Sequence, residues 1–505
     1  MDQDTTTPVI SESPKSIPRT MPDTKPPKVS ATDGDFSEEK PVTFPTPANS
    51  GRFWNKPRLK QYWHDGVLYT SQSSYEVDTS ILFVDLLYVG IIAVNADTTV
   101  ENLTKTAFLR FCVTFLPTWK IWSDIAILVS QFEADELSQR TIILFILACL
   151  VGFTTNIYSA FYTTYAQLVA FYLAARFCVA LVTLALALFI PRVRPIMLFN
   201  LVSILVPAVF WIGSCFLDEN LREILIWLAI SFDMWGSLII VWLIRDVPKL
   251  STTIAGRVKQ TFQYFPAIEV RHRSERVGAF VSLVFGYSVV GILYQSQSKF
   301  GINAFYGKAV LGLVQAFCFN WLYFDVDQKY QQAKSTQRHT ISAALWFNAH
   351  LPFIMAFTLS AAALSRLVVA HDCINADPEH LTPMYEERSE AELTDGLRWF
   401  YCSGLGISFL CMGVISLARG DPPRRNERIP QKLRLVLRAA VAVVWICLPL
   451  AKELNSLELI GITASTTVFA LAVDVYGMGQ EDLPREDTDQ FEPRPVTRRE
   501  TVIGF

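Results

Sequence analysis

The sequence is too apolar and too poor in charge for an ordinary soluble protein. Its 505 residues are 51% hydrophobic and only 18% charged, whereas soluble domains carry about 25% charged residues. A net charge of −3 leaves no basic surface of the kind that binds nucleic acid. We therefore expect membrane lipid as the main surroundings of the chain and no nucleic-acid partner.

Both ends of the chain read as polar tails. Residues 1–50 contain nine prolines among Ser, Thr, Asp and Lys, and such a segment cannot bury enough apolar surface to fold. We predict a disordered cytoplasmic tail over 1–50, a juxtamembrane segment over 51–78, and a second disordered cytoplasmic tail over 476–505.

Apolar runs recur between the two tails. A bilayer core needs about 20 mostly apolar residues per helix. The pattern predicts an all-α fold, a polytopic integral membrane helical bundle of about 12 transmembrane helices, with 10 as the lower bound because the last two runs are short. The predicted spans are 79–97, 106–130, 140–160, 165–190, 195–217, 222–244, 277–297, 305–324, 341–369, 396–418, 433–450 and 456–475.

Basic residues in the connecting loops test this layout. If the N-terminus is inside, the inside loops and helix ends hold 24 Lys and Arg, and the outside ones hold seven. Such a bias favours a cytoplasmic location for both termini. The loop 246–276 would then be a cytoplasmic linker between two six-helix halves, 79–245 and 277–475, a layout common in transporters.

Three ionisable side chains in the first two spans are candidates for a path through the bundle. Asp85 lies well inside "SILFVDLLYVGIIAV", where an unpaired carboxylate costs about 2.5–3.5 kcal/mol. Lys120 and Asp124 are four residues apart and can meet on one helix face. This pair is either structural or part of a polar path, and Trp119 and Trp122 are expected to point mostly away from it.

Other polar residues in the spans are scattered. His350 precedes Pro352 in "WFNAHLPFIMAF" and is either a packing residue or a path residue, and Arg176, Asp233, Asp325 and Asp474 are further buried candidates. These residues form no phosphate loop, no zinc-protease motif and no recognisable triad. The nine cysteines form no CxxC pair, so we expect no cofactor, no metal and no catalytic residue.

The stretch "VRHRSERVGAFVSLVFGYSVVGILYQ", residues 270–295, places a charged cluster before an apolar run. His272 and Arg276 fit a charge anchor at the cytoplasmic entrance of a span. Alternatively, Glu275 bridges this helix to a basic residue on another helix, and Gly278 permits close approach of the two.

Several stretches in this order resemble the low temperature requirement A (LtrA) family of membrane proteins. They are "SILFVDLLYV", "FLPTWKIWSDI", "SFDMWGS", "HRSERVGAFVSLVFGYSVV", "WLYFDVD" and "AHLPFIMAF", and they cover roughly residues 75–370. The resemblance implies a polytopic membrane fold. It also implies that ten residues of this chain match residues of the family's motifs. They are Asp85, Trp119, Trp122, His272, Glu275, Arg276, Gly278, Gly286, Asp325 and His350.

The chain departs from the family pattern at two carboxylates. Ile81 stands where the family commonly has a glutamate before the first-span aspartate, and Tyr287 follows Gly286 where the family commonly has another. The resemblance therefore implies a membrane fold more firmly than any proton- or cation-coupled chemistry.

We expect a non-enzymatic multi-pass membrane protein that moves or binds a small solute or ion. Two alternatives stay open. One is a structural or sensory membrane protein whose polar residues only join helices, and the other is an intramembrane lipid-modifying enzyme. An enzyme would need its ionisable groups at one depth, whereas the candidates lie at several.

Overall fold

The computed structural model describes residues 42–44, 57–64, 67–71, 79–133, 136–245, 256, 258, 260–267, 270–295, 302–326, 340–419 and 427–478. All of them belong to one compact unit. The predicted disordered tails lie outside the described residues, except that Val42–Phe44 form a strand and residues 476–478 are helical, at the end of the last helix.

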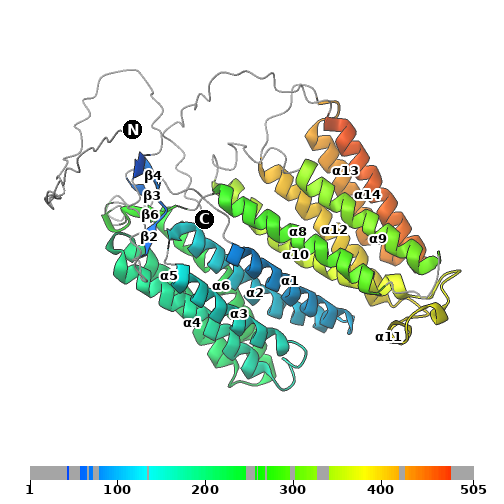
Figure 1. Ribbon diagram of the computed structural model, residues 1–505, viewed down its shortest axis with the longest axis horizontal. Helices are drawn as coiled ribbons and strands as arrows, with labels where there is room; N and C mark the ends of the chain where they lie inside the picture. The colour runs from blue at the N-terminus through cyan, green and yellow to red at the C-terminus, as the bar shows by residue number, and fades with distance from the viewer. Residues whose placement is uncertain are drawn as a thin grey trace, which may run out of the picture. The chain divides into compact units, whose positions relative to one another are not determined.

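The first set of helices runs from residue 79 to residue 245. Helix α5 packs between α4 and α6, α3 packs against α4, and α2 contacts α1, α4 and α6 (Figure 1). The members of this set are α1 (Thr79–Val100), α2 (Lys105–Gln131), α3 (Glu136–Thr155), α4 (Tyr165–Phe189), α5 (Arg194–Ser214) and α6 (Glu219–Arg245).

The second set of helices follows residue 270. Its members are α8 (Val270–Gln295), α9 (Ala304–Trp321), α10 (Thr340–Val369), α12 (Asp395–Arg419), α13 (Gln431–Cys447) and α14 (Ser456–Met478). Helix α10 packs against α8, α9, α12 and α14, and it also contacts α1 of the first set. Helix α8 contacts both α1 and α2, so α8 and α10 join the two sets.

Each predicted span coincides with one of these twelve helices. Ten of them are long and apolar enough to cross a membrane within the described ranges. Helices α6 and α9 are not among the ten, and the side chains of α6 are described only as far as residue 236. The prediction of an all-α polytopic bundle is confirmed, with ten to twelve spans.

Several predicted boundaries are off by three residues or more, among them both ends of α3, which is Glu136–Thr155 and not 140–160. Helix α8 begins at Val270 and not at residue 277, because the prediction placed its start at the first apolar residue and the charged turn before that residue is already helical. Helix α9 ends at Trp321 and continues as a π-helical turn, Leu322–Val326. The predicted end at residue 324 therefore falls inside that turn.

Small residues bring the helices of the second set close together. A Cβ atom on Gly404 of α12 would lie 2.7 Å from the Ala356 carbonyl oxygen of α10, and one on Gly406 would lie 2.8 Å from the Ala442 carbonyl oxygen of α13. Such distances are shorter than side-chain carbons tolerate, so glycine is required at both positions. Close backbone approach at small residues is typical of helix packing in membranes.

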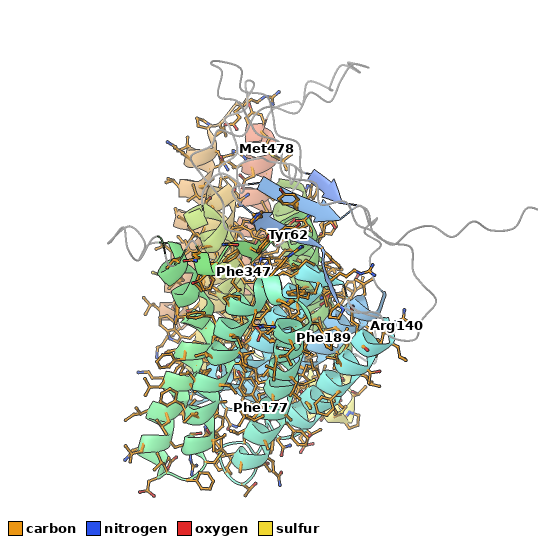
Figure 2. The ribbon with its side chains drawn as sticks, turned by 90° about the vertical axis from the view of Figure 1, so that its left-hand side faces the viewer. Tyr62, Arg140, Phe177, Phe189, Phe347 and Met478 are labelled. Atoms are coloured by element: carbon orange, nitrogen blue, oxygen red, sulfur yellow. The ribbon has the colours of Figure 1, made fainter. Side chains whose placement is uncertain are left out.

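The outer surface of the helices is apolar. Figure 2 looks onto the helices that carry Phe177 and Phe189, whose side chains are 38% and 49% exposed. Phe83, Leu144 and Leu181 are exposed by more than half. Large exposed apolar surfaces are unusual on soluble monomers, and they suit contact with lipid.

Two small sheets, which the sequence analysis did not predict, lie outside the helices. The larger has the strand order β1-β4-β3-β6, from β1 (Val42–Phe44), β4 (Val67–Ser71), β3 (Gln61–His64) and β6 (Tyr264–Pro266). The smaller pairs β2 (Arg58–Leu59) with β5 (Phe132–Glu133). The strands β3 and β6 pair antiparallel, with Trp63 opposite Phe265, so the predicted linker 246–276 contains a strand that pairs with the segment before α1.

Candidate functional site

Asp85 on α1 is fully buried and holds an ion pair with Arg276 of α8. Its Oδ1 accepts a hydrogen bond from Arg276 Nη2 at 2.8 Å and another from Trp122 Nε1 of α2 at 2.8 Å. Arg276 is itself 5% exposed. The carboxylate therefore joins three helices, α1, α2 and α8, through groups that stabilise its charged form.

Asp124 on α2 lies between two basic side chains. Its Oδ1 pairs with Lys120 Nζ at 2.7 Å, one helical turn earlier on the same face. Its Oδ2 accepts a hydrogen bond from Arg176 Nη1 of α4. The expected pairing of Lys120 with Asp124 is therefore present, and Arg176 extends it to a third residue.

Arg176 continues to a second acid, Asp233 of α6. Arg176 Nη2 donates to Asp233 Oδ1 at 2.8 Å, and both side chains are at most 3% exposed. Asp233 Oδ2 accepts hydrogen bonds from the Tyr172 hydroxyl at 2.8 Å and from Trp211 Nε1 at 3.1 Å. Buried charges are stable only when they are paired and hydrogen-bonded, and Asp233 has three such donors.

Tyr88 of α1 interacts electrostatically with two of these acids, Asp85 and Asp124. It is one turn after Asp85 on α1, it is 1% exposed, and its hydroxyl is within electrostatic reach of both Asp124 and Asp85. Among the residues that the structure describes, neither the Tyr88 hydroxyl nor Asp85 Oδ2 has a hydrogen-bond partner. Two buried polar atoms are thus available to a proton, a water or an ion.

We call the six paired ionisable residues the charged network. It has three acids and three bases and therefore no net charge when all six are ionised. Its members are Asp85, Lys120, Asp124, Arg176, Asp233 and Arg276. They come from five helices, α1, α2, α4, α6 and α8.

The members of the charged network lie at different distances from the ends of their helices. Asp85 lies six residues after Thr79, the first residue of α1, which is about 9 Å along the helix axis. Arg176 lies thirteen residues before Phe189, the last residue of α4, which is about 20 Å. Arg176 is therefore farther from the end of its helix than Asp85 is from the start of its own.

A second polar group lies farther along α1. The Thr114 hydroxyl of α2 donates to Asn95 Oδ1 at 2.7 Å, and the Tyr287 hydroxyl of α8 donates to Asp97 Oδ1 at 2.7 Å. Ile92 is 2% exposed, and it occupies the same helix face as Tyr88 and Asn95, four residues after one and three before the other. This isoleucine separates the two polar groups.

The charged cluster of residues 270–276 divides between two environments. Arg276 is buried in the charged network, whereas Glu275 is exposed. Arg273 lies over the Phe347 ring of α10, 3.6 Å from its centroid. The structure shows a bridge from this cluster to another helix at Arg276, and the side chain of His272 lies outside the described residues.

The remaining predicted residues lie apart from the charged network. His350 is fully buried, and its ring nitrogens lie 2.9 Å from the Tyr323 hydroxyl and 2.7 Å from the Trp346 carbonyl oxygen. Gly278 is buried, whereas Gly286 faces open space. Asp325 lies in the π-helical turn, and its side chain is outside the described residues.

The two tryptophans of α2 face the interior. Trp122 reaches Asp85, and Trp119 packs on Trp122 with ring centroids 4.9 Å apart. Both rings also contact Phe280 of α8. They enclose the Asp85 carboxylate in an apolar wall, which removes water from around its charge.

Sequence reasoning named the acids and Arg176 and paired Lys120 with Asp124, but it missed the contacts between separate helices. The partners Asp85 and Arg276 are 191 positions apart, and no spacing rule connects them. Tyr172 gave a weak indication, since it is one turn before Arg176 on the same helix face. Asp474 forms a separate buried cluster, with Arg434 at 3.2 Å and Arg438 at 2.7 Å.

Comparison with known proteins gives one match. No curated protein and no solved structure matches the chain. A family model described as "Bacterial low temperature requirement A protein (LtrA)" matches residues 77–474. That range begins just before α1 and ends within α14, so it covers both sets of helices. The chain is an integral multi-pass membrane protein and belongs to the LtrA family.

Proposed function

We propose that this protein moves a small ion or solute across the membrane and that protonation of the charged network couples to this movement. The observation that carries the proposal is a set of six paired ionisable residues, four of them buried and two nearly so, with the Tyr88 hydroxyl within electrostatic reach of Asp85 and Asp124. The proposal treats the protein as non-enzymatic, with membrane lipid and a small solute or ion as its partners, and with both termini in the cytoplasm.

The energetics of burial support a functional role. Replacing buried ion pairs by well-packed apolar residues is often neutral or stabilising, so a bundle that needed only stability would gain little from six charges. Ionisable residues inside membrane spans usually mark ion pathways or proton relays. Asp85 Oδ2 and the Tyr88 hydroxyl supply the acceptor and the donor that such a relay requires.

The positions of the two polar groups along α1 support a path through the bundle that is closed in this structure. The charged network lies on one side of Ile92, and the Asn95 and Asp97 groups lie on the other. Phe111 and Phe115 of α2 are each 1% exposed, so apolar side chains fill this level of the interface. Movement of α1 relative to α2 or α8 would be needed to connect the two polar groups, as in alternating access.

The proposal is tested with protons as the transported probe. Purified protein is reconstituted into liposomes that contain a pH-sensitive dye, and a potassium diffusion potential drives proton entry. We expect entry above that of protein-free liposomes. Asp85→Asn and Asp124→Asn should each reduce the rate by about tenfold or more, since each removes a carboxylate that takes part in the relay.

The control is Asp395→Asn. Asp395 pairs with Lys452 at 2.9 Å on the surface, with side chains 63% and 71% exposed, so its loss should leave the rate unchanged. Absence of proton entry, or equal rates for all three variants and the parent, would refute the coupling and favour a structural role for the network.

A further inference from the structure

A small, partly open cavity lies within the second set of helices, away from the charged network. It is lined by residues of α8, α9, α10 and α12 and offers about 10 Å³ to the centre of a water-sized sphere. A cavity needs about 10–15 Å³ on this measure to hold one water molecule. The space therefore fits one water-sized molecule.

Gln315 of α9 lines this cavity with an incompletely bonded amide. The side chain is 2% exposed, and its Oε1 accepts a hydrogen bond from the Tyr401 hydroxyl at 2.9 Å. Within the described part of the chain, its Nε2 has no hydrogen-bond partner. A buried polar atom without a partner is costly, so a molecule in the cavity that bonds to it would stabilise the fold.

The Tyr401 hydroxyl fixes which amide atom of Gln315 faces the cavity. Because Tyr401 donates to Gln315 Oε1, the amide nitrogen is the atom left for the cavity, where it is a donor. The Tyr401 oxygen also lies 2.7 Å from Thr463 Oγ1, which helps to hold the hydroxyl in place.

The serines that line the cavity present acceptors. The Ser288 hydroxyl donates to the Phe285 carbonyl oxygen at 2.7 Å, and the Ser360 hydroxyl donates to the Tyr401 carbonyl oxygen at 2.9 Å. Each hydroxyl hydrogen is therefore in use, and each oxygen keeps lone pairs. The cavity then contains one neutral donor, from Gln315, and two neutral acceptors, from Ser288 and Ser360.

This set of groups selects the ligand. An ion of either sign would be buried among lining residues that carry no charge, which costs its hydration without a counter-charge. We propose that one water molecule occupies this cavity, accepts a hydrogen bond from Gln315 and donates its two hydrogens to Ser288 and Ser360, linking α8, α9 and α10.

Radiolytic hydroxyl-radical labelling of the protein in membranes tests the site. Radicals form from bound water under an X-ray pulse and oxidise the side chains beside it. Phe357 and Leu364 line the cavity, whereas Phe353 and Leu367 on the same helix α10 do not, and all four side chains are at most 4% exposed. We expect oxidation of Phe357 and Leu364 at least fivefold above that of Phe353 and Leu367.

Two variants separate water from other causes. Ala361→Val adds two methyl groups at a lining position, and it should lower oxidation of Phe357 and Leu364 to the level of Phe353 and Leu367. If that variant does not fold, Ser360→Ala removes one acceptor and should lower it at least twofold. Equal oxidation of lining and non-lining side chains in the parent, or no change in the folded variants, would overturn the proposal.

Discussion

Arg276 and Glu275 are adjacent in sequence and differ completely in environment. Arg276 holds the buried Asp85 carboxylate at 2.8 Å, whereas Glu275 is exposed at the start of the same helix. On a helix, neighbours point about 100° apart, so only one of the two can face α1. The structure places the arginine there.

The first prediction compares these neighbours. Arg276→Gln leaves Asp85 as an uncompensated buried charge and should cost about 3–5 kcal/mol of stability. Glu275→Gln changes an exposed residue and should melt with the parent. Thermal unfolding in detergent measures both. If Glu275→Gln were the more damaging change, the bridge between helices would belong to Glu275 and not to Arg276.

The second prediction concerns Asp124, which has two basic partners. Asp124→Asn leaves both Lys120 and Arg176 without its charge, so we expect a loss of about 3–5 kcal/mol. Lys120→Gln should cost less, because Asp124 keeps Arg176.

The double change Lys120→Gln with Asp124→Asn isolates the Lys120 contribution. We expect it to recover part of the loss, because Lys120 no longer remains unpaired, but not all of it, because Arg176 still does. Folded yield and melting temperature in detergent are the measurements. Identical values for Asp124→Asn and the double variant would mean that Lys120 and Asp124 do not interact.

Residue identities could be predicted more readily than residue contacts. The cost of a charge in the bilayer was enough to single out Asp85, Lys120 and Asp124. The pairing of Lys120 with Asp124 followed from their spacing of four. The contacts from Asp85 to Arg276 and from Arg176 to Asp233 join separate helices, and helix order in a bundle is not encoded in local spacing.

At the scale of elements, long helices were predictable and short strands were not. Each span carries about 20 apolar residues, whereas β6 has three residues, too few for an alternating pattern. The β3–β6 pairing joins residues about 200 positions apart, and stacking of His64 on Tyr264, with ring centroids 4.2 Å apart, accompanies it.

The third prediction tests that pairing. Trp63 and Phe265 are directly opposite in antiparallel strands, where Cβ atoms lie about 4.5–5.5 Å apart. Trp63→Cys combined with Phe265→Cys should form a disulfide under mild oxidation, detected as a linked peptide pair by mass spectrometry. Trp63→Cys combined with Tyr264→Cys is the control, because successive strand residues face opposite sides. Equal linkage in both variants would contradict the register.

At the scale of the whole molecule, the recurring apolar runs predicted the helical bundle. The Lys and Arg residues of the loops predicted the orientation of that bundle in the membrane. Loop charge can set orientation because Lys and Arg resist translocation. The arrangement of helices around α10, the most buried of the candidate spans, depends instead on side-chain fit at positions such as Gly404 and Gly406. No local rule predicts that fit.

The last prediction concerns orientation in the membrane. The segment between α10 and α12 contains the short helix α11 (Pro383–Glu386), and it is rich in Glu and Asp, whereas the loops predicted to be cytoplasmic carry most of the Lys and Arg. The bias of basic residues places this segment outside. An epitope inserted after Glu387, which is exposed, should bind antibody on intact cells or right-side-out vesicles.

The matched control is the same epitope at the N-terminus, which should bind antibody only after permeabilisation. An odd number of spans before residue 387 places the two sites on opposite sides, and the predicted layout has nine. If both epitopes became accessible only after permeabilisation, one of the helices before α11 would not cross the membrane. Helix α9 would then be the first candidate for a helix that does not cross, because it carries the buried Lys308 and is not among the ten apolar spans found in the described ranges.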